Sequence, residues 1–259
     1  MTKEQLLTEG VLAKFLRYVQ IDSPSQPGQD TTPSTKEQWV IAEQLCNELK
    51  TLGLEDAKVD EFGFVTATLP GKVEGCPVVS FLAHMDTVPG VPGHGVRPLV
   101  HENYDGGDIQ LPSGDVLSPK AFPLLLEAKG HTIITSDGTT LLGADDKAGV
   151  AEIMEAICRL LRQPEIEHGT IKVAFTPDEE IATGISNFDV KSFGADLGYT
   201  IDSSAYGAMQ DETFNADNYI VTIHGVSAHT GTARNAMINA VHLAGEFVGA
   251  IPATMRPET

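Results

Sequence analysis

Three short apolar runs in this sequence each lead directly into acidic or imidazole side chains, and this arrangement most constrains the fold. The runs are residues 78–83, 171–175 and 198–201, and the groups that follow them are His84, Asp86, Glu179, Glu180 and Asp202. Nearly continuous apolar runs of this length are typical of strands covered on both faces of a sheet. In an open α/β sheet such groups gather at the carboxyl ends of parallel strands, so we expect them to converge there.

Amphipathic segments alternate with these strands. Helical spacing of apolar residues predicts helices over residues 4–19 and 147–161. Ser34-Thr-Lys-Glu37 has the form of a capping box, which predicts a helix that begins there and ends before Gly53. Residues 87–129 are rich in Pro and Gly and predict a long irregular rim or lid. The pattern predicts an α/β fold with three layers and a mostly parallel sheet.

The pattern changes near Asp211. Residues 218–224 alternate like a half-exposed strand, and residues 236–250 have helical spacing. We interpret this part as the opening of a second, smaller α+β domain. The expected division is residues 1–212 and residues 213–259, and the second domain is expected to be incomplete.

Composition excludes some classes of partner and compartment. With 17 basic and 36 acidic residues the formal net charge is -19, which argues against nucleic acid and anionic membranes as partners. Cys46, Cys76 and Cys158 form no CxxC pair and are odd in number, as expected in a reducing compartment. No signal peptide and no apolar run of membrane-spanning length is evident. These features predict a cytoplasmic protein.

The polar groups after the strands are those of a metal-dependent hydrolytic site. A neutral imidazole such as His84 is a good zinc ligand, and one of the adjacent carboxylates Asp145 and Asp146 is able to bridge two cations. Alternatives stay open for each group alone. A His-x-Asp also occurs as a surface feature, and the adjacent acids Asp145 and Asp146 also suit a helix N-terminus.

Together the motifs resemble those of a known family, the M20 zinc metallopeptidases. The similar segments are His84-Met-Asp86, Gly143-Ala-Asp-Asp-Lys-Ala-Gly149, Thr176-Pro-Asp-Glu-Glu180 and Tyr199-Thr-Ile-Asp202. Within the family the chain is most similar to the tripeptide aminopeptidases of the M20B subfamily, since further matches occur at Glu102–Ile109, Val116–Pro119 and Gly231–Arg234. The resemblance covers the whole chain. It implies a phosphorylase/hydrolase-like catalytic domain followed by the start of a ferredoxin-like lid, or dimerisation, domain.

The resemblance also implies a role for each motif residue. Two zinc ions, replaceable by Co²⁺ or Mn²⁺, would be held by His84, Asp145, Glu180 and Asp202. Asp145 would bridge the two ions and would be followed by a cis peptide bond, while Asp146 would not be a ligand. Glu179 would be the general base for the water between the metals, and Asp86 would orient His84.

Further implied features concern the lid and the substrate. His229 would donate to the developing oxyanion in the site of a partner subunit, which implies a homodimer. Arg234 and Asn235 are candidates for binding the carboxyl end of a tripeptide. The family pattern includes a further His ligand from a later segment, and these 259 residues contain no match for it.

Rival interpretations share the metal site. Other M20 hydrolases, namely dipeptidases, carboxypeptidases and N-acyl amino acid deacylases, differ in the lid and the rim. A binding module that keeps the fold without catalysis is less consistent with Glu179, because a metal-binding scaffold needs no general base. A truncated fragment with little activity is the remaining alternative.

Overall fold

The structure is a computed structural model that describes residues 1–203, 206–213 and 219–256. The chain forms two compact units, Met1–Gly207 and Ala208–Thr259, and each is described by itself. Within the described residues, no helix combines the length and the apolar character needed to cross a lipid bilayer.

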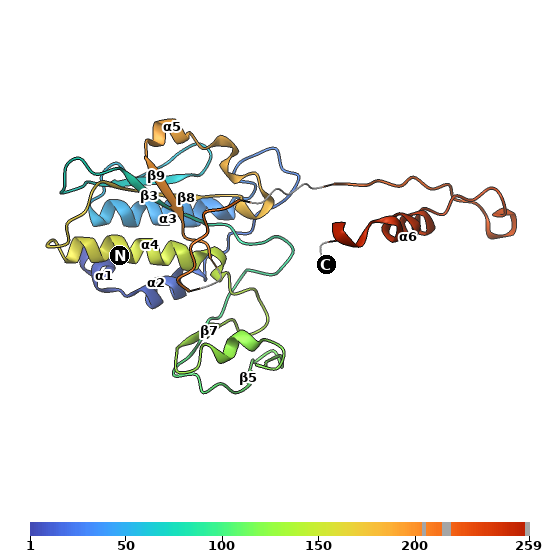
Figure 1. Cartoon of the computed structure of the whole chain (residues 1–259), viewed down its shortest axis with the longest axis horizontal. Helices are drawn as coiled ribbons and strands as arrows, with labels where there is room; N and C mark the ends of the chain where they lie inside the picture. Colours follow the sequence, from blue (N-terminus) through green and yellow to red (C-terminus); the bar gives the residue numbers. More distant parts are fainter. Residues whose placement is uncertain (204–205, 214–218, 257–259) are drawn as a thin grey trace. The chain divides into compact units, whose positions relative to one another are not determined.

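A five-stranded sheet forms the centre of the first unit (Figure 1). Its strands, in spatial order, are β1 (Lys58–Val59), β2 (Val65–Leu69), β8 (Ile171–Thr176), β3 (Val79–His84) and β9 (Leu197–Thr200). β3 pairs in parallel with β8 and β9, whereas β2 pairs antiparallel with β1 and β8. The predicted α/β class is confirmed, but the sheet is mixed rather than mostly parallel. The three strands that precede the motif residues are the parallel ones.

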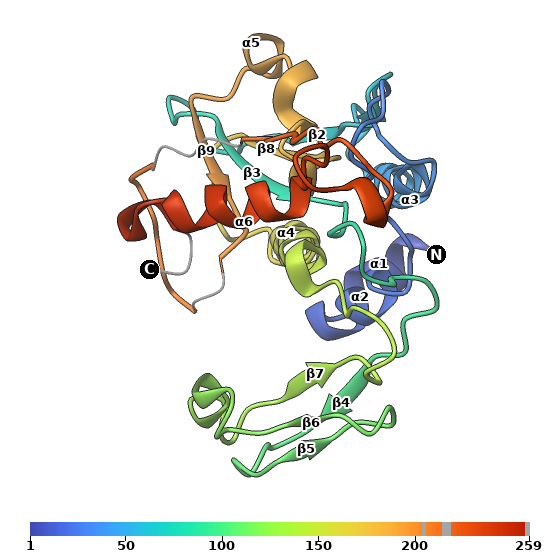
Figure 2. The same cartoon turned by 90° about the vertical axis from the view of Figure 1, so that its right-hand side faces the viewer.

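Helices lie on both sides of this sheet. The helices of the unit are α1 (Lys3–Thr8), α2 (Val11–Tyr18), α3 (Glu37–Leu52), α4 (Ala144–Arg162) and α5 (Val190–Phe193). α3 packs against β1 and β2, and α4 packs against β3 on the same face (Figures 1 and 2). α5 lies on the opposite side of the sheet (Figure 1).

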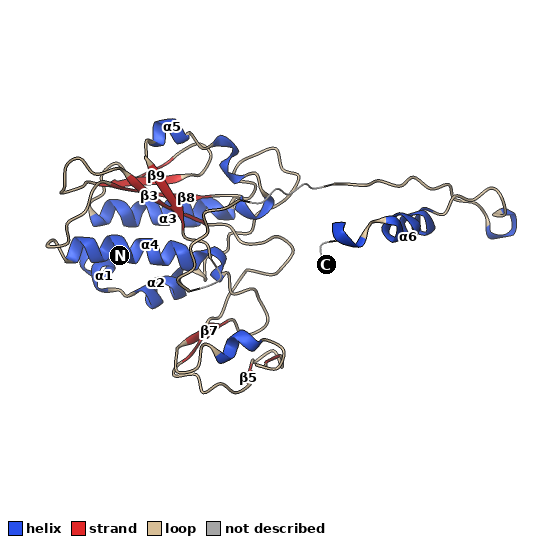
Figure 3. Cartoon of the chain, viewed as in Figure 1, coloured by secondary structure: helices blue, strands red, loops and turns tan. Residues whose placement is uncertain are grey.

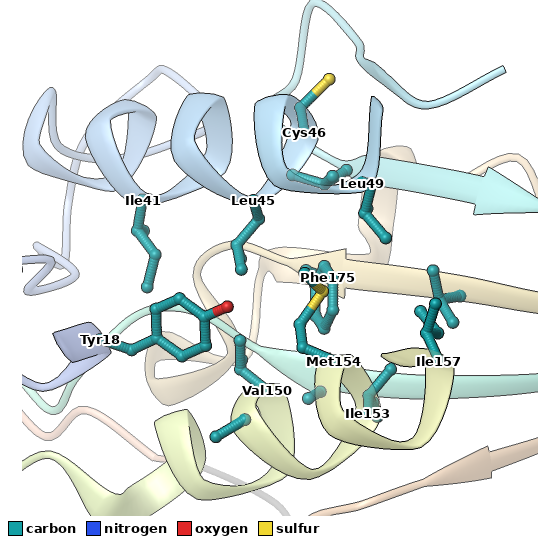
Figure 4. Packing of buried hydrophobic residues seen from close by; sticks show 14 of the residues in the cluster. Tyr18, Ile41, Leu45, Cys46, Leu49, Val150, Ile153, Met154, Ile157 and Phe175 are labelled. Atoms are coloured by element: carbon teal, nitrogen blue, oxygen red, sulfur yellow. The ribbon is translucent and has the colours of Figure 1, made fainter. Parts of the chain in front are cut away.

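The hydrophobic core lies between α3, α4 and the sheet. Ile41 and Leu45 of α3 face Val150 and Met154 of α4, with Phe175 of β8 beside them (Figure 4). All five side chains are fully buried. Burial of this apolar surface stabilises the arrangement in which α3 and α4 cover one face of the sheet.

The predicted helix over residues 4–19 is in fact two helices. The chain breaks at Gly10, which has extended backbone and serves as the N-cap of α2. The ammonium group of Lys14, buried in α2, donates to the carbonyl oxygens of Leu6 and Glu9 at the end of α1. The break is stable because this side chain satisfies carbonyls that no longer have partners within a helix.

The predicted capping box is also wrong. α3 begins at Glu37, and its N-cap residue Lys36 makes no side-chain cap. The Ser34 hydroxyl instead donates to the carboxylate of Asp178, 2.5 Å away and 144 positions later in the chain. A tertiary hydrogen bond has replaced the local one.

The segment predicted as an irregular rim contains small sheets. β4 (Leu99–His101) pairs with β7 (Ile133–Thr135), and β5 (Ile109–Gln110) pairs with β6 (Val116–Leu117), both antiparallel. A 3-10 helix, η1 (Pro123–Leu126), lies between β6 and β7 in the sequence. Figure 2 shows these elements grouped together below α2.

The second unit contains one longer helix, α6 (Ala240–Ala250), in place of the predicted helix over residues 236–250. α6 starts later because the Asn239 side chain accepts from the backbone N–H groups of Val241 and His242 and so caps it. The expected strand over residues 218–224 is not formed by residues 219–224, and residue 218 lies outside the described residues (Figure 3).

We expect the hydrophobic core between α3, α4 and the sheet to carry a large share of the stability. Leu45→Ala should lower the free energy of unfolding by about 2–5 kcal/mol, because it leaves a cavity in a fully buried site. Val40→Ala on the same helix, where the side chain is 57% exposed, should change it by less than about 0.5 kcal/mol. Urea denaturation of both variants measures this. Equal losses would show that α3 does not pack as described.

Candidate active site

The carboxyl ends of the three parallel strands bring the motif residues to one edge of the sheet. His84 is the last residue of β3 and pairs in register with Thr176, the last residue of β8. The neighbouring strand β9 continues this edge, because the Ile201 N–H donates to the carbonyl of Leu82 on β3 at 2.7 Å. Glu179 and Asp202 follow β8 and β9 within a few residues. The predicted convergence at the strand ends is therefore what the structure contains.

His84 is the centre of this group. Its ring is 2% exposed, and Nε2 lies 2.9 Å from a carboxylate oxygen of Asp145, 3.8 Å from Asp202 and 3.9 Å from Glu179. Among the described residues, one group offers ligand atoms that all lie within 4.8 Å of one another, and it consists of His84, Asp145 and Asp202. The carboxylates of Asp145 and Glu179 are 73% and 53% exposed, so the group opens to solvent.

The buried carboxylate of Asp86 joins the ends of β3 and β8. Its two oxygens accept the backbone N–H groups of Glu179 at 3.0 Å and Glu180 at 3.1 Å. Its backbone carbonyl lies 3.0 Å from Nδ1 of His84. Because a carbonyl only accepts, Nδ1 carries the proton in this contact, and Nε2 is free to face the acidic group.

The carboxylate of Asp146 does not join the acidic group but holds the backbone beside it. Its carboxylate accepts from the backbone N–H of His84 at 3.2 Å and of Gly149 at 3.1 Å. A Cβ atom on Gly149 would lie 2.0 Å from the carbonyl oxygen of Ile201, so only glycine fits there. The peptide bond between Asp145 and Asp146 is cis, as the family resemblance implied.

The electrostatics reflect several carboxylates around one buried imidazole. Burial lowers the pKa of His84, but hydrogen bonds to Asp86 and Asp145 and the charges of Asp86 and Asp146 outweigh it and raise this pKa to about 10. Burial, together with the charge of Asp202, raises the pKa of Asp146 to about 8. Burial likewise raises the pKa of three further carboxyl groups, those of Glu179, Glu180 and Asp202. A bound cation would relieve the mutual repulsion of these carboxylates.

Four predicted site residues are not part of the His84 group. The backbone N–H of Glu180 donates to Asp86, but the carboxylate of Glu180 is not in the cluster of His84, Asp145 and Asp202. His229, Arg234 and Asn235 belong to the second unit. There the imidazole of His229 accepts from the backbone N–H of Gly231 at 3.1 Å, and Asn235 has a positive φ of 61°.

One buried residue beside the site was not predicted from the sequence. Lys147 is 2% exposed, and its ammonium group donates to the carbonyl oxygen of Ile21. Burial lowers its pKa to about 8, opposed by the charges of Asp22 and Asp86. It lies inside the acidic motif, but no local pattern distinguishes a buried lysine from an exposed one on α4.

The donor set fits a zinc-type cation. One imidazole nitrogen and carboxylate oxygens are the ligands that Zn²⁺ takes in hydrolytic sites, whereas Mg²⁺ prefers oxygen ligands alone. Because Nδ1 is held by the carbonyl oxygen of Asp86, Nε2 is the nitrogen that faces the carboxylates of Asp145 and Asp202, and it would bind the cation once it has lost its proton.

The chain is similar to known peptidases over most of its length. Peptidase T from Geobacillus thermodenitrificans is 49% identical over 255 residues, which cover 97% of this chain and 62% of that protein. Peptidase T from Listeria welshimeri is 50% identical with the same coverage. The chain thus spans about three fifths of the length of the curated relatives it matches.

Solved structures and a family model also show similarity to M20 peptidases. The aminopeptidase PepT from Bacillus cereus is 26% identical with a TM-score of 0.51, over 97% of this chain and 57% of that one. A tripeptidase from Staphylococcus aureus is 26% identical with a TM-score of 0.56 and the same coverage. The family model of the M20 peptidase dimerisation domain matches residues 212–259. The resemblance predicted from the motifs is confirmed: the chain is similar to peptidase T over nearly its whole length, and its residues 212–259 match the dimerisation domain of the M20 peptidases.

Proposed function

We propose that the protein is a metal-dependent aminopeptidase that releases the N-terminal residue of tripeptides. The observation that carries the proposal is the buried His84. Its Nε2 faces the carboxylates of Glu179 and Asp202, which follow parallel strands, and that of Asp145 at the start of α4. The relatives support the substrate class, since they include an aminopeptidase PepT and a tripeptidase. The chain spans 62% of the length of its relative from Geobacillus thermodenitrificans, so the activity is proposed for the whole protein.

The ligands of two zinc ions would be His84, Asp145, Glu180 and Asp202. Asp145 would be shared by both ions, because its exposed carboxylate lies beside the imidazole at 2.9 Å. When bound, the ions would make a water molecule acidic near neutral pH and withdraw electrons from the scissile carbonyl. Asp86 would keep His84 in the tautomer that presents Nε2.

Glu179 would be the general base. Its carboxylate is half exposed and lies 3.9 Å from Nε2 of His84, so water and peptide both have access to it. Its raised pKa suits the role, because a base with a pKa nearer the working pH also returns its proton readily to the leaving amine.

The second unit would begin the lid. We divide the protein into a three-layer catalytic domain that includes residues 1–212 and a dimerisation domain that begins at residue 213. In a homodimer His229 would donate to the oxyanion in the partner's site, while Arg234 and Asn235 would bind the carboxyl end of the substrate. The cytoplasmic location stays a prediction.

Replacement of the base tests the mechanism. Glu179→Gln should lower kcat by about 10²- to 10⁴-fold, because the amide cannot accept the proton. Zinc content should stay at the wild-type level, measured by atomic absorption, because the residue is not a proposed ligand. Glu43→Gln, on the exposed side of α3, serves as the matched control and should keep full activity. An unchanged kcat for Glu179→Gln would remove this residue from the mechanism.

The requirement for a free amine tests the substrate class. A tripeptide should be cleaved at least about tenfold faster than its N-acetylated form, since one charge pair with the acidic group contributes about 1–4 kcal/mol at 4 Å. Chromatography of the products from both peptides measures this difference. Faster cleavage of the acetylated peptide would identify a deacylase or carboxypeptidase instead.

Removal of the metal tests the cofactor. Dialysis against a chelator should abolish activity, and Zn²⁺ should restore it while Mg²⁺ should not, because the proposed ligands include an imidazole nitrogen. His84→Ala should bind less zinc per chain than the wild type in the same assay. Full activity in protein free of metal would contradict the proposal.

A further inference from the structure

The backbone turn that carries Glu179 and Glu180 has an unfavourable conformation. Asp178, directly before them, has a positive φ of 55° in the left-handed region. Residues other than glycine adopt this region at a cost and keep it only when their surroundings hold them there. Asp178 is the N-cap residue of the 3-10 helix η2 (Glu179–Ile181), so its conformation sets the directions of the Glu179 and Glu180 side chains.

One set of contacts holds the turn from the side of the metal site. Asp86 accepts the N–H groups of Glu179 and Glu180, as described above. These contacts fix the backbone that follows Asp178. They do not involve Asp178 itself, whose conformation depends on other contacts.

A second set of contacts holds Asp178 from the opposite side, at the start of α3. Both Asp178 and Gln38 are 0% exposed. The Gln38 amide donates to the Asp178 carboxylate at 2.7 Å, and its oxygen accepts the Asp178 backbone N–H at 3.1 Å. Ser34 donates to the same carboxylate from its hydroxyl at 2.5 Å and from its backbone N–H at 2.8 Å. Side chain and backbone of Asp178 are thus both held.

We propose that Gln38, together with Ser34, is a positioning residue for Glu179 and Glu180. The two-way contact between Gln38 and Asp178 locks the left-handed residue, and this fixes where the following base and metal ligand point. Gln38 touches neither substrate nor metal. The roles of Glu179 and Glu180 in this inference rest on the proposed function.

The decisive variant is Gln38→Glu. It keeps the size of the side chain and the oxygen that accepts the Asp178 N–H, but it turns the amide donor into a carboxylate that faces the Asp178 carboxylate. The turn should shift, and the affinity for zinc should fall by about 10- to 100-fold, as for other residues that orient metal ligands. In the active enzyme kcat should fall by about the same factor with KM little changed, because no group that binds substrate is altered.

Two further variants separate positioning from general stability. Gln44→Glu is the matched control, since Gln44 lies on the same helix and its amide also donates to a carboxylate, that of Glu48, at 3.0 Å. It should lower the thermal midpoint without changing zinc affinity or kcat. The double variant Gln38→Glu with Asp178→Asn exchanges donor and acceptor across the contact. It should recover most of the lost zinc affinity.

The experiment uses the protein as expressed from its own gene, with zinc dissociation constants from competition with a chromophoric chelator and kinetics on a tripeptide. Zinc affinity decides the inference even if no tripeptide is cleaved, so a failure of the proposed activity remains distinguishable. Loss in Gln38→Glu, retention in Gln44→Glu and recovery in the double variant would support positioning. Wild-type zinc affinity and kcat in Gln38→Glu, or equal losses in Gln38→Glu and Gln44→Glu, would overturn it.

Discussion

The hydrogen bonds of Asp86 are the interaction on which the rest of the site depends. This buried carboxylate follows β3, yet its partners are the backbone N–H groups of Glu179 and Glu180 after β8. It therefore fixes the spacing between two strand ends that are adjacent only in the folded sheet. Its backbone carbonyl also sets the tautomer of His84. One residue thus couples the imidazole to the turn that carries the proposed base.

The acidic motifs divide their carboxylates between two tasks. In three of the four motifs one acid is buried and accepts hydrogen bonds, while a neighbouring group faces the solvent-accessible cluster. The buried acids are Asp86, Asp146 and Asp178, and the cluster groups beside them are His84, Asp145 and Glu179. A buried carboxyl group needs hydrogen-bond donors in place of water, and here backbone N–H groups, Gln38 and Ser34 provide them. Acids adjacent in the sequence therefore have different tasks: the buried one holds the backbone, and the exposed one faces the proposed metal site.

The periodic patterns predicted elements well where the local signal was strong. The runs before His84, Glu179 and Asp202 are strands, and the segment after Asp146 is a long helix. Predictions were wrong where a side chain made a contact other than the one that the local pattern implied. Lys14 caps the end of α1 and permits the break at Gly10, and Ser34 bonds to Asp178 instead of capping α3. Asp178 lies 144 positions from Ser34, outside the window that a local pattern uses. Lys14 is close in sequence to the carbonyl groups it contacts, but apolar spacing carries no information on a buried ammonium group.

By itself the sequence determined the resemblance to the M20 peptidases, the α/β class and the identity of the groups at the strand ends, because apolar runs, turn residues and motif spacing are local properties. Tertiary structure alone decided which strands are neighbours, hence that the sheet is mixed and that His84, Asp145 and Asp202 meet. It also decided which acids are buried and that Gln38 holds Asp178 from 140 positions away. These outcomes follow from packing and from the need of every buried polar group for a partner, and both involve residues far apart in the chain.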